Sequence, residues 1–299
     1  MVPAPDILCV GSVFWDVIGR SERRMEPGGD MPGRIVRVPG GVAMNVAAAL
    51  RSLEMTPALL TATGLDNESE ELMEACERMG VITEHVYRSA NLPPGRYMAI
   101  EDAGGLIAAV ADARALETAG ARILSPLADG TFGSPEVPHE GIVALDGNLA
   151  ADLLAEIATS PLFRAADLRV ASASPAKAGR IAPLLSHPGA TIYANREEAE
   201  NICGTPFSTA MAAARALRRR GGATTRALVT DGAATAADAN ADEVVAATPP
   251  AVRPVRITGA GDRFMAAHIA AERGGMDRAD ALNAANRAAA NHVAGKDQP

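Results

Sequence analysis

The sequence predicts an α/β domain built on a mostly parallel sheet, with a smaller β-sheet attached to it. From about residue 120, short apolar runs alternate with helical patterns, which is typical of a parallel sheet with helices on both faces. A β-hairpin pattern near residue 100 lies outside this alternation. Hydrophobic residues make up 48% of the 299 residues, enough for a large core. Because no repeat or long linker divides the chain, we expect one domain over residues 1–299.

The first third of the chain contains both strand and helix patterns. Apolar runs predict strands at 6–13, 34–38 and 58–64. Helical spacing predicts helices at 43–53 and 68–79. Two further apolar runs flank a Gly-containing turn and predict a hairpin, with strands at 97–100 and 106–110. We expect the smaller sheet to come from the segments 12–40 and 95–113.

The rest of the chain alternates between strands and helices. Strands are predicted at 121–125, 142–145, 168–172, 190–193 and 226–230. The helices between them are predicted at 149–158, 175–185, 196–202 and 208–220. The chain then closes with two Ala-rich helices, at 261–273 and 277–294.

Composition excludes several classes of protein. The chain has 28 basic and 36 acidic residues and a net charge of −8, which argues against binding to nucleic acid or to an anionic membrane surface. A small anion in a locally positive pocket remains compatible with this charge. Cys9, Cys76 and Cys203 are far apart, so neither a zinc site nor a disulfide framework is expected. No signal-peptide or membrane-span pattern is present, and we expect a cytoplasmic protein.

The segment Thr258-Gly259-Ala260-Gly261-Asp262 opens an apolar helix and is the strongest local signal for chemistry. Small residues let backbone N–H groups approach an anion, and the helix N-terminus adds partial positive charge. An Asp beside such amides can take a proton from a hydroxyl while the amides hold a phosphate, which is what phosphoryl transfer to an alcohol needs. Taken alone, the segment also fits a Gly-rich turn with Asp262 as an N-cap.

The Gly40-Gly41 pair joins the predicted strand at 34–38 to a helix that carries Asn45. Two glycines permit a ligand to approach the backbone closely. An amide one turn into the helix is suited to a pair of sugar hydroxyls. The alternative is a tight strand-to-helix turn with a solvated Asn45.

Asn195 and Glu198 directly follow the strand predicted at 190–193. Ligands of open α/β sheets bind at the carboxyl ends of the strands, and these two side chains there can hold a metal–water cluster beside phosphates. The alternative is that Asn195 caps a helix whose first turn is acidic.

The order and spacing of these segments resemble the ribokinase-like (pfkB) carbohydrate kinase family along nearly the whole chain. The matching motifs are Gly-x-x-x-x-Asp from Gly11 to Asp16, Gly-Gly-x-x-x-Asn from Gly40 to Asn45, Asn-x-x-Glu from Asn195 to Glu198, Thr-Asp-Gly from Thr230 to Gly232, and Gly-Ala-Gly-Asp from Gly259 to Asp262. The resemblance implies a three-layer α/β/α domain with a small β-sheet lid. It also implies transfer of the ATP γ-phosphoryl group to a primary hydroxyl of a sugar or nucleoside.

The resemblance assigns roles to individual positions. Asp262 matches the catalytic base, and the anion hole is matched by Gly259, Ala260 and Gly261. Residues matching the sugar site are Asp16, Gly40, Gly41 and Asn45. Residues matching the nucleotide site are Asn195, Thr230, Gly232, Thr258 and Asn286. Glu198 matches a residue that holds Mg²⁺ through water, so ATP and Mg²⁺ are the expected cofactors.

Within the family, several segments are most similar to pseudouridine kinases, namely 95–100, 111–117, 146–149, 172–178 and 195–200. Arg96 and Asp112 flank the hairpin strands and are candidates to face the bound sugar or base, with packed or solvated lid residues as the alternative. The family's lid often pairs between subunits. A homodimer through the lid is therefore expected.

Arg256 departs from the family pattern, which usually has Asp at the first position of Asp-Thr-x-Gly-Ala-Gly-Asp. That Asp commonly helps to form a monovalent-cation site beside the anion hole. An Arg there repels K⁺ and supplies fixed positive charge itself, so the sequence predicts weak or absent activation by K⁺. The departure also leaves open a weakened enzyme.

The leading hypothesis from the sequence is an ATP-dependent kinase that makes pseudouridine 5′-phosphate. One alternative is a kinase for another acceptor of the family, such as ribose, adenosine or another nucleoside, or a keto-deoxy sugar acid. Another is a non-catalytic sugar- or nucleoside-binding relative. Arg256 favours this last alternative, whereas the intact Asp262 and the Asn195–Glu198 pair argue against it.

Overall fold

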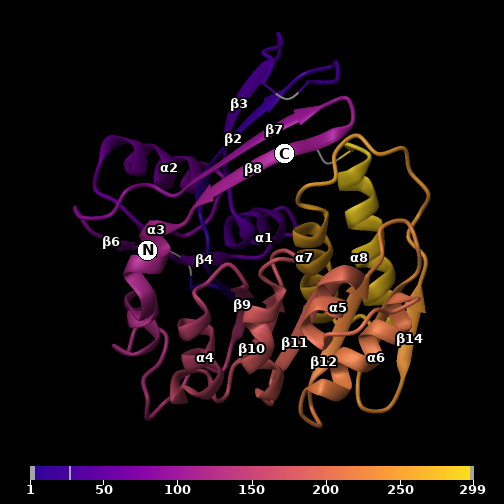
Figure 1. The fold of residues 1–299 in the computed structure, drawn as a ribbon. Helices are drawn as coiled ribbons and strands as arrows, with labels where there is room; N and C mark the ends of the chain where they lie inside the picture. The colour runs from indigo at the N-terminus through magenta and orange to yellow at the C-terminus, as the bar shows by residue number, and fades with distance from the viewer. Residues whose placement is uncertain (1–3, 27, 297–299) are drawn as a thin grey trace.

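The main sheet of the protein is mixed, with a parallel body and an antiparallel edge (Figure 1). The computed structural model describes residues 4–26 and 28–296. Across the sheet of this described part, the strands follow the order β4 (Pro57–Leu60), β1 (Ile7–Val10), β9 (Ile142–Asp146), β10 (Asp167–Ala171), β11 (Ala190–Asn195), β12 (Arg226–Thr230), β13 (Ala236–Ala239) and β14 (Val244–Ala247). All neighbours from β4 to β12 pair in parallel, and β13 and β14 add antiparallel pairings.

The helices connect these strands and cover the sheet. The α-helices are α1 (Val42–Arg51), α2 (Asn67–Arg78), α3 (Arg114–Ala119), α4 (Ala151–Thr159), α5 (Arg196–Cys203), α6 (Ala210–Arg220), α7 (Ala260–Arg273) and α8 (Arg278–Val293). Short 3₁₀ helices are η1 (Gly120–Leu127), η2 (Pro161–Phe163) and η3 (Ala178–Ser186). No helix within residues 4–26 and 28–296 combines the length and the apolar character that crossing a bilayer requires.

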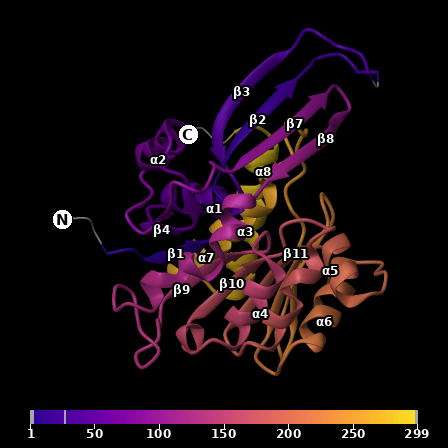
Figure 2. The ribbon, with the colours of Figure 1, turned by 60° about the vertical axis from the view of Figure 1, so that its left-hand side comes forward.

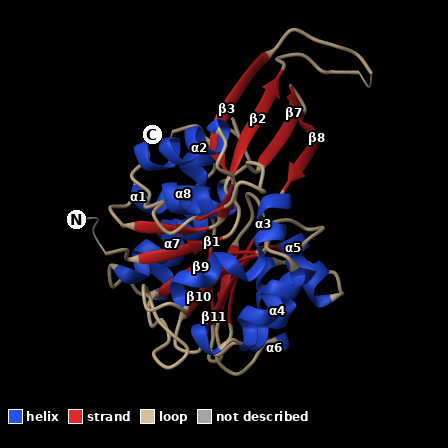
Figure 3. Cartoon of the chain, turned by 90° about the vertical axis from the view of Figure 1, so that its left-hand side faces the viewer, coloured by secondary structure: helices blue, strands red, loops and turns tan. Residues whose placement is uncertain are grey.

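Strand β1 shows why helices are needed on both faces of the sheet. Its four residues are all fully buried, and side chains alternate between the two faces of a strand. Ile7 and Cys9 pack with apolar residues of α1, α2, α7 and α8, whereas Leu8 and Val10 pack with residues of α3 to α6. Figure 3 shows the strands between these two groups of helices. The predicted three-layer α/β/α architecture is therefore confirmed.

A second, smaller sheet projects from one end of the main body (Figures 2 and 3). Its strands lie in the order β3 (Arg34–Gly40), β2 (Phe14–Arg20), β7 (Arg96–Asp102) and β8 (Gly105–Asp112). The predicted hairpin is the antiparallel β7–β8 pair, and β2 pairs in parallel with β7. These strands lie within the segments 12–40 and 95–113 that the sequence indicated. We refer to this sheet as the lid.

Two predicted elements differ in the structure. Residues 121–125 were predicted to form a strand, but they belong to the 3₁₀ helix η1, in which Ile123, Leu124 and Leu127 are buried. Pro126 also lacks the N–H that a strand ladder needs. The helix predicted at 175–185 is the 3₁₀ helix η3, which contains Pro183. A proline inside a helix removes one N–H donor of the regular α-helical pattern.

The sequence patterns missed several short elements. They are β2, β13, β14, the helix α3, and the two-stranded pairing of β5 (Ala62–Thr63) with β6 (Tyr87–Arg88). Alanines make up much of β13 and β14, and alanine is depleted in strands, so these sequences carry little strand signal. The remaining helices begin and end close to their predicted positions.

Candidate active site

A cavity of about 720 Å³ lies between the lid and the carboxyl ends of the main-sheet strands. Most of the predicted site residues line it together, namely Asp16, Gly41, Asn45, Asn195, Glu198, Thr230, Gly232, Thr258, Gly259, Ala260, Gly261 and Asp262. They come from segments up to 246 positions apart in the chain, the separation between Asp16 and Asp262. The fold therefore brings the motifs of the sequence into one site.

Asp262 lies in the first turn of α7, which begins after Gly259. Gly259 has φ 85°, in the left-handed region that favours glycine. The carboxylate Oδ2 of Asp262 accepts a hydrogen bond of 2.9 Å from Asn45 Nδ2, so the second and last motifs meet directly. Burial raises the pKa of Asp262 to about 7, although the Asn45 bond lowers it; nearby Asp146, Asp16 and Glu198 add to the rise.

The amides at the start of α7 differ in their availability. Among the described residues, the Ala260 N–H donates to Ile257 O at 3.1 Å, so the structure already engages one of the three amides predicted for the anion hole. The neighbouring glycines, Gly259 and Gly261, line the cavity. First-turn N–H groups of a helix have no partner within the helix and are suited to anions.

Asp16 lies on β2, and its carboxylate lies against Gly40 at the end of the neighbouring strand β3. Its Oδ1 atom is buried and has no hydrogen-bond partner within the described residues, and burial raises the pKa of its carboxyl group to about 7. A Cβ atom at Gly40 would lie 2.0 Å from Asp16 Oδ2, and one at Gly41 would lie 2.6 Å from Ser12 O. Glycine is therefore required at both positions, for steric reasons that the sequence did not reveal.

A chain of hydrogen bonds that sequence reasoning missed supports one wall of the cavity. Asp146 is buried and accepts from the Ser12 N–H at 2.8 Å and from the Ser12 hydroxyl. Its other oxygen accepts from Asn148 N and Nδ2 at 2.7 and 2.8 Å. Lys177 Nζ donates to Asn148 Oδ1 at 2.7 Å, and Ser12, Asn148 and Lys177 line the cavity. Burial, followed by the charge of Arg180, lowers the pKa of Lys177.

Asn195 and Glu198 form a capping box at the start of α5. Asn195 Oδ1 accepts from Glu198 N at 2.9 Å, and Glu198 Oε2 accepts from Asn195 N at 2.8 Å. Ser172 Oγ also donates to Glu198 Oε2, at 2.5 Å. Asn195 and Glu198 therefore cap α5 and also line the cavity, because the capping box holds the Glu198 carboxylate at the carboxyl end of β11.

Four predicted site residues do not line the cavity. Gly40 is buried next to Asp16, and Asn286 on α8 is buried with its Nδ2 donating to Ala247 O at 3.0 Å. Arg96 binds Glu68, and Asp112 binds Arg114. Arg96 and Asp112 pair across the hairpin, and the next pair, Tyr97 and Ala111, lines the cavity instead. Because successive strand residues face opposite sides, Arg96 and Asp112 point to the side opposite Tyr97 and Ala111.

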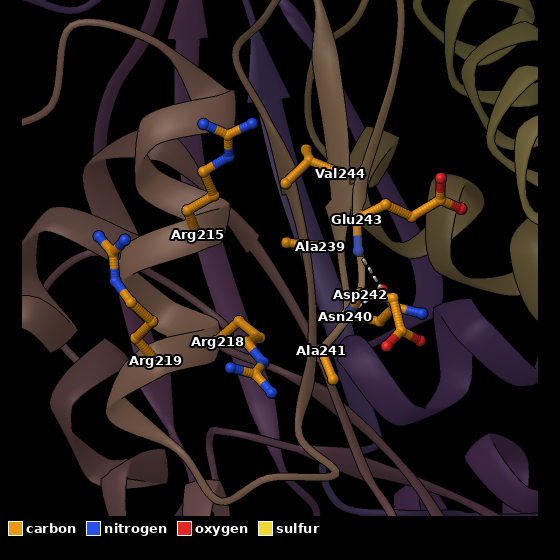
Figure 4. A pocket seen from close by; sticks show the side chains of 9 residues that line it. All are labelled: Arg215, Arg218, Arg219, Ala239, Asn240, Ala241, Asp242, Glu243 and Val244. Atoms are coloured by element: carbon orange, nitrogen blue, oxygen red, sulfur yellow. Dashed lines mark hydrogen bonds between the residues drawn. The ribbon is translucent and has the colours of Figure 1, made fainter.

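A second cavity, of about 280 Å³, lies between α6 and the β13–β14 turn (Figure 4). Arg215, Arg218 and Arg219 line one side of it, and residues 239–244 line the other. The turn lies at the end of β13 away from Thr230 and Gly232, since β13 runs antiparallel to β12. None of the predicted site residues lines this second cavity.

Arg256 lies between the lining residues and the end of α8. Its Nε donates to His292 O at 3.2 Å, and its backbone N–H donates to Val293 O at 3.2 Å. The guanidinium group of Arg256, the residue that departs from the family pattern, therefore lies against the end of α8.

The chain matches the profile of the pfkB family carbohydrate kinases over residues 4–296. It belongs to this family. Two kinases of Escherichia coli (strain K12) match part of the chain. An uncharacterized sugar kinase, YeiI, is 30% identical over 184 residues, covering 60% of this chain and 47% of the relative. A pseudouridine kinase is 26% identical over 207 residues, covering 68% of this chain and 62% of the relative. The match thus spans less than two thirds of either curated relative.

Solved structures share the fold of this pfkB family member. A carbohydrate kinase from Agrobacterium tumefaciens has a TM-score of 0.77 and 26% identity, covering 96% of this chain and 90% of that chain. A ribokinase of Arabidopsis thaliana, complexed with ribose and ATP, has a TM-score of 0.75 and 21% identity, covering 97% and 93%. The ribokinase-like fold predicted from the sequence is therefore confirmed.

Proposed function

We propose that this protein is an ATP-dependent kinase that phosphorylates the 5′-hydroxyl of pseudouridine. The observation that carries the proposal is the pair of half-buried carboxylates, Asp16 and Asp262, in one cavity, with Asp16 Oδ1 unpartnered in the described structure. A buried carboxylate oxygen without a donor fits a ligand hydroxyl. Membership of the pfkB family and the pseudouridine kinase relative support the reaction and the acceptor.

In the proposed reaction, Asp262 acts as the general base. Its ionised carboxylate takes the proton of the 5′-hydroxyl as the hydroxyl oxygen forms a bond to the γ-phosphorus of ATP and the bond to the β,γ-bridging oxygen breaks, leaving ADP. Asn45 holds the carboxylate in place. The N-terminal amides of α7 stabilise the charge on the transferring phosphoryl group, and closure of the lid excludes water.

The residues around the strand ends fit ATP with Mg²⁺. Among the described residues, no group of three or more His, Cys, Asp and Glu side chains could hold a metal alone. Mg²⁺ is usually bound by one or two carboxylates, by waters and by substrate phosphates, and Glu198 suits this role because the capping box fixes it. Asn195, Thr230, Gly232 and Thr258 would bind the nucleotide. When bound, Mg²⁺ supplies charge neutralisation of the phosphates.

The choice of a nucleoside as acceptor rests on the part of the cavity wall that Asn148 and Lys177 form. The segments 146–149 and 172–178 carry part of the similarity to pseudouridine kinases, and both reach the cavity. An ammonium group and an amide there provide hydrogen bonds for the carbonyl and N–H groups of a uracil ring. A free pentose has no such groups, so this wall favours a nucleoside.

The proposal is tested by ADP formation with Mg-ATP across pseudouridine, uridine, cytidine, adenosine, ribose and a keto-deoxy sugar acid. Turnover of pseudouridine well above the others supports the proposed acceptor. Turnover of a different acceptor from this set supports the kinase chemistry, with that compound as the acceptor in place of pseudouridine. If calorimetry shows that an acceptor binds but no acceptor is turned over, the non-catalytic alternative is favoured.

The pH profile of kcat/KM is expected to decline below pH about 7, well above the ordinary range for an Asp base. The reason is that Asp262 accepts a proton only when ionised, and burial raises its pKa to about 7. Asp16 has a similarly raised pKa, so the Asp16→Asn variant separates the two groups. If kcat/KM of this variant still declines below pH about 7, the decline is due to Asp262. If kcat/KM of the wild type declines only near pH 4, the expectation is wrong.

Lys177→Met is expected to lower kcat/KM for pseudouridine by about 10- to 100-fold, the usual loss for a hydrogen bond to a charged group. Activity with ribose, however low, should change far less, because ribose has no base to contact Lys177. The matched control is Lys296→Met, which removes the chain's other lysine at an exposed position. An equal loss for both acceptors would contradict the assignment of Lys177 to the base.

The reaction rate is expected to be the same in K⁺ and in Na⁺ at constant ionic strength. Arg256 donates to the carbonyl of His292 beside the loop that carries Thr258, so a fixed cation already lies there. Steady-state rates in the two salts test this. A strong increase in K⁺ alone would show that a cation site exists despite Arg256.

We also propose that two subunits pair through their lids, and that the enzyme acts in the cytoplasm. Large apolar side chains are exposed on the lid strands, including Ile35, Met98 and Val110, which are 75%, 57% and 72% exposed. Exposed apolar patches mark interaction surfaces. Sedimentation of the wild type and of Val110→Glu tests the dimer.

A further inference from the structure

His292, in the last turn of α8, contacts the loop that leads into the anion hole. The side chain is 7% exposed, and its Nε2 lies 2.8 Å from Thr258 O. Because a carbonyl oxygen only accepts, Nε2 carries the proton in this hydrogen bond. A Cβ atom at Gly259 would lie 3.2 Å from the same nitrogen, so the ring packs closely against the peptide between Thr258 and Gly259.

The orientation of that peptide determines where the Gly259 N–H points. In a trans peptide the C=O of one residue and the N–H of the next point in opposite directions. With Thr258 O directed at His292, the Gly259 N–H is directed away from His292. Thr258 and Gly259 line the active-site cavity and His292 does not, so this opposite side is the side of the cavity.

Other contacts hold the same loop on either side of this peptide. Val255 and Arg256 N–H both donate to Val293 O, and Arg256 Nε donates to His292 O. These bonds fix residues 255 and 256 against the end of α8. The Ala260 N–H donates to Ile257 O at 3.1 Å and closes a turn whose central peptide joins Thr258 to Gly259. Gly259 has φ 85°, a permissive backbone position, and the carbonyl of this central peptide is held by the bond from His292.

We infer that His292 is a positioning residue of the phosphoryl-transfer site, which orients the Gly259 amide toward the transferring phosphoryl group through its hydrogen bond to Thr258 O. The inference rests on the proposed kinase function. It predicts an effect mainly on the transition state, because the amide faces charge that develops as the phosphoryl group moves.

The test compares His292→Leu with His292→Gln. His292→Leu removes the donor at similar volume and is expected to lower kcat by about 10- to 1000-fold, up to the loss of a whole oxyanion-hole donor. KM for ATP should change by less than about threefold, since ground-state binding is spread over many contacts. His292→Gln keeps an N–H donor on a side chain of similar reach and should recover much of kcat.

His187→Leu is the matched control. His187 is also buried, and its Nε2 contacts Phe163 O at 2.9 Å, but it lies outside the active-site cavity. Both leucine variants lose a buried histidine-to-carbonyl bond, and His187→Leu also loses the bond that His187 Nδ1 accepts from Gly189 N at 3.1 Å, so both are expected to lose thermal stability. Only His292→Leu should lose kcat. Equal losses of kcat in the two variants, or no recovery in His292→Gln, would overturn the inference.

A binding measurement separates this inference from the proposed reaction. Mg-ADP with aluminium fluoride imitates the transferring phosphoryl group, and calorimetry should show that His292→Leu weakens its binding at least about tenfold relative to Mg-ADP alone. The wild type could bind the aluminium fluoride complex and yet turn over no acceptor, which would reject the proposed function. The role of His292 would then still be supported if His292→Leu weakened that binding. Unchanged binding in His292→Leu, or no preference of the wild type for aluminium fluoride, would reject the role of His292.

Discussion

Asp262→Asn lowers kcat by about 10³-fold, within the range expected for removing a general base, while binding of ATP and acceptor is retained. An amide cannot accept the hydroxyl proton, yet it preserves the shape of the side chain and a hydrogen bond with Asn45. Steady-state kinetics give kcat, and calorimetry gives the two affinities. A variant with near wild-type kcat would mean that the proton leaves by another route and that Asp262 only positions the acceptor.

The same substitution has a stability signature that shows whether the variant folds normally. The pKa of Asp262 is raised from 3.8 to about 7 in the folded protein, so its ionised form destabilises the fold. The wild type therefore loses stability as pH rises from about 4 to about 7, and the deficit stays constant above that. Asp262→Asn should melt at a higher temperature than the wild type at pH 8, with the difference shrinking toward pH 4. A lower melting temperature at pH 8 would point to misfolding.

Gly40→Ala lowers kcat/KM by about 10²-fold, the loss typical of displacing a positioning group by an ångström or so. The new Cβ would overlap the Asp16 carboxylate, 2.0 Å from Oδ2, and that carboxylate must move. Asp16 is the proposed partner of an acceptor hydroxyl, so KM for the acceptor should rise most. Steady-state kinetics with varied acceptor at saturating ATP measure the effect.

Gly179→Ala is the control for this variant, because no atom lies within 4 Å of a Cβ at Gly179. It should keep both kinetic constants and stability. Gly40→Ala should also lose about 1 to 3 kcal/mol of stability, as overpacked sites do. If its acceptor KM equals that of Gly179→Ala, Asp16 does not bind the acceptor hydroxyl.

Periodicity and motif order allowed much of the site to be predicted. The helical spacing of α7 and its preceding glycines placed Asp262 at a helix N-terminus, where the structure has it. Asn195 was expected beside a ligand at the carboxyl end of a strand, and it lines the cavity together with Thr230 and Asp262. These features follow from local backbone preferences and from the rule that ligands bind at the carboxyl ends of strands.

Side-chain direction in the lid was harder to predict. Arg96 and Asp112 are polar and lie beside the hairpin, yet Tyr97 and Ala111 face the cavity. Polarity alone does not say which face of the four-stranded lid meets the ligand, since one face meets solvent and the other meets the main body. Only the docking of the lid decides this, and a one-residue shift reverses it.

The amino-acid sequence by itself determined the α/β fold class, the family and the order of the Gly-rich motifs. It could do so because these depend on local periodicity, on backbone freedom and on short motifs. Tertiary structure alone decided the pKa of Asp262, the contact of His292 with Thr258 and the link from Lys177 to Asp146. Burial and long-range contacts set these properties, because desolvation and hydrogen-bond partners come from segments that only folding brings together.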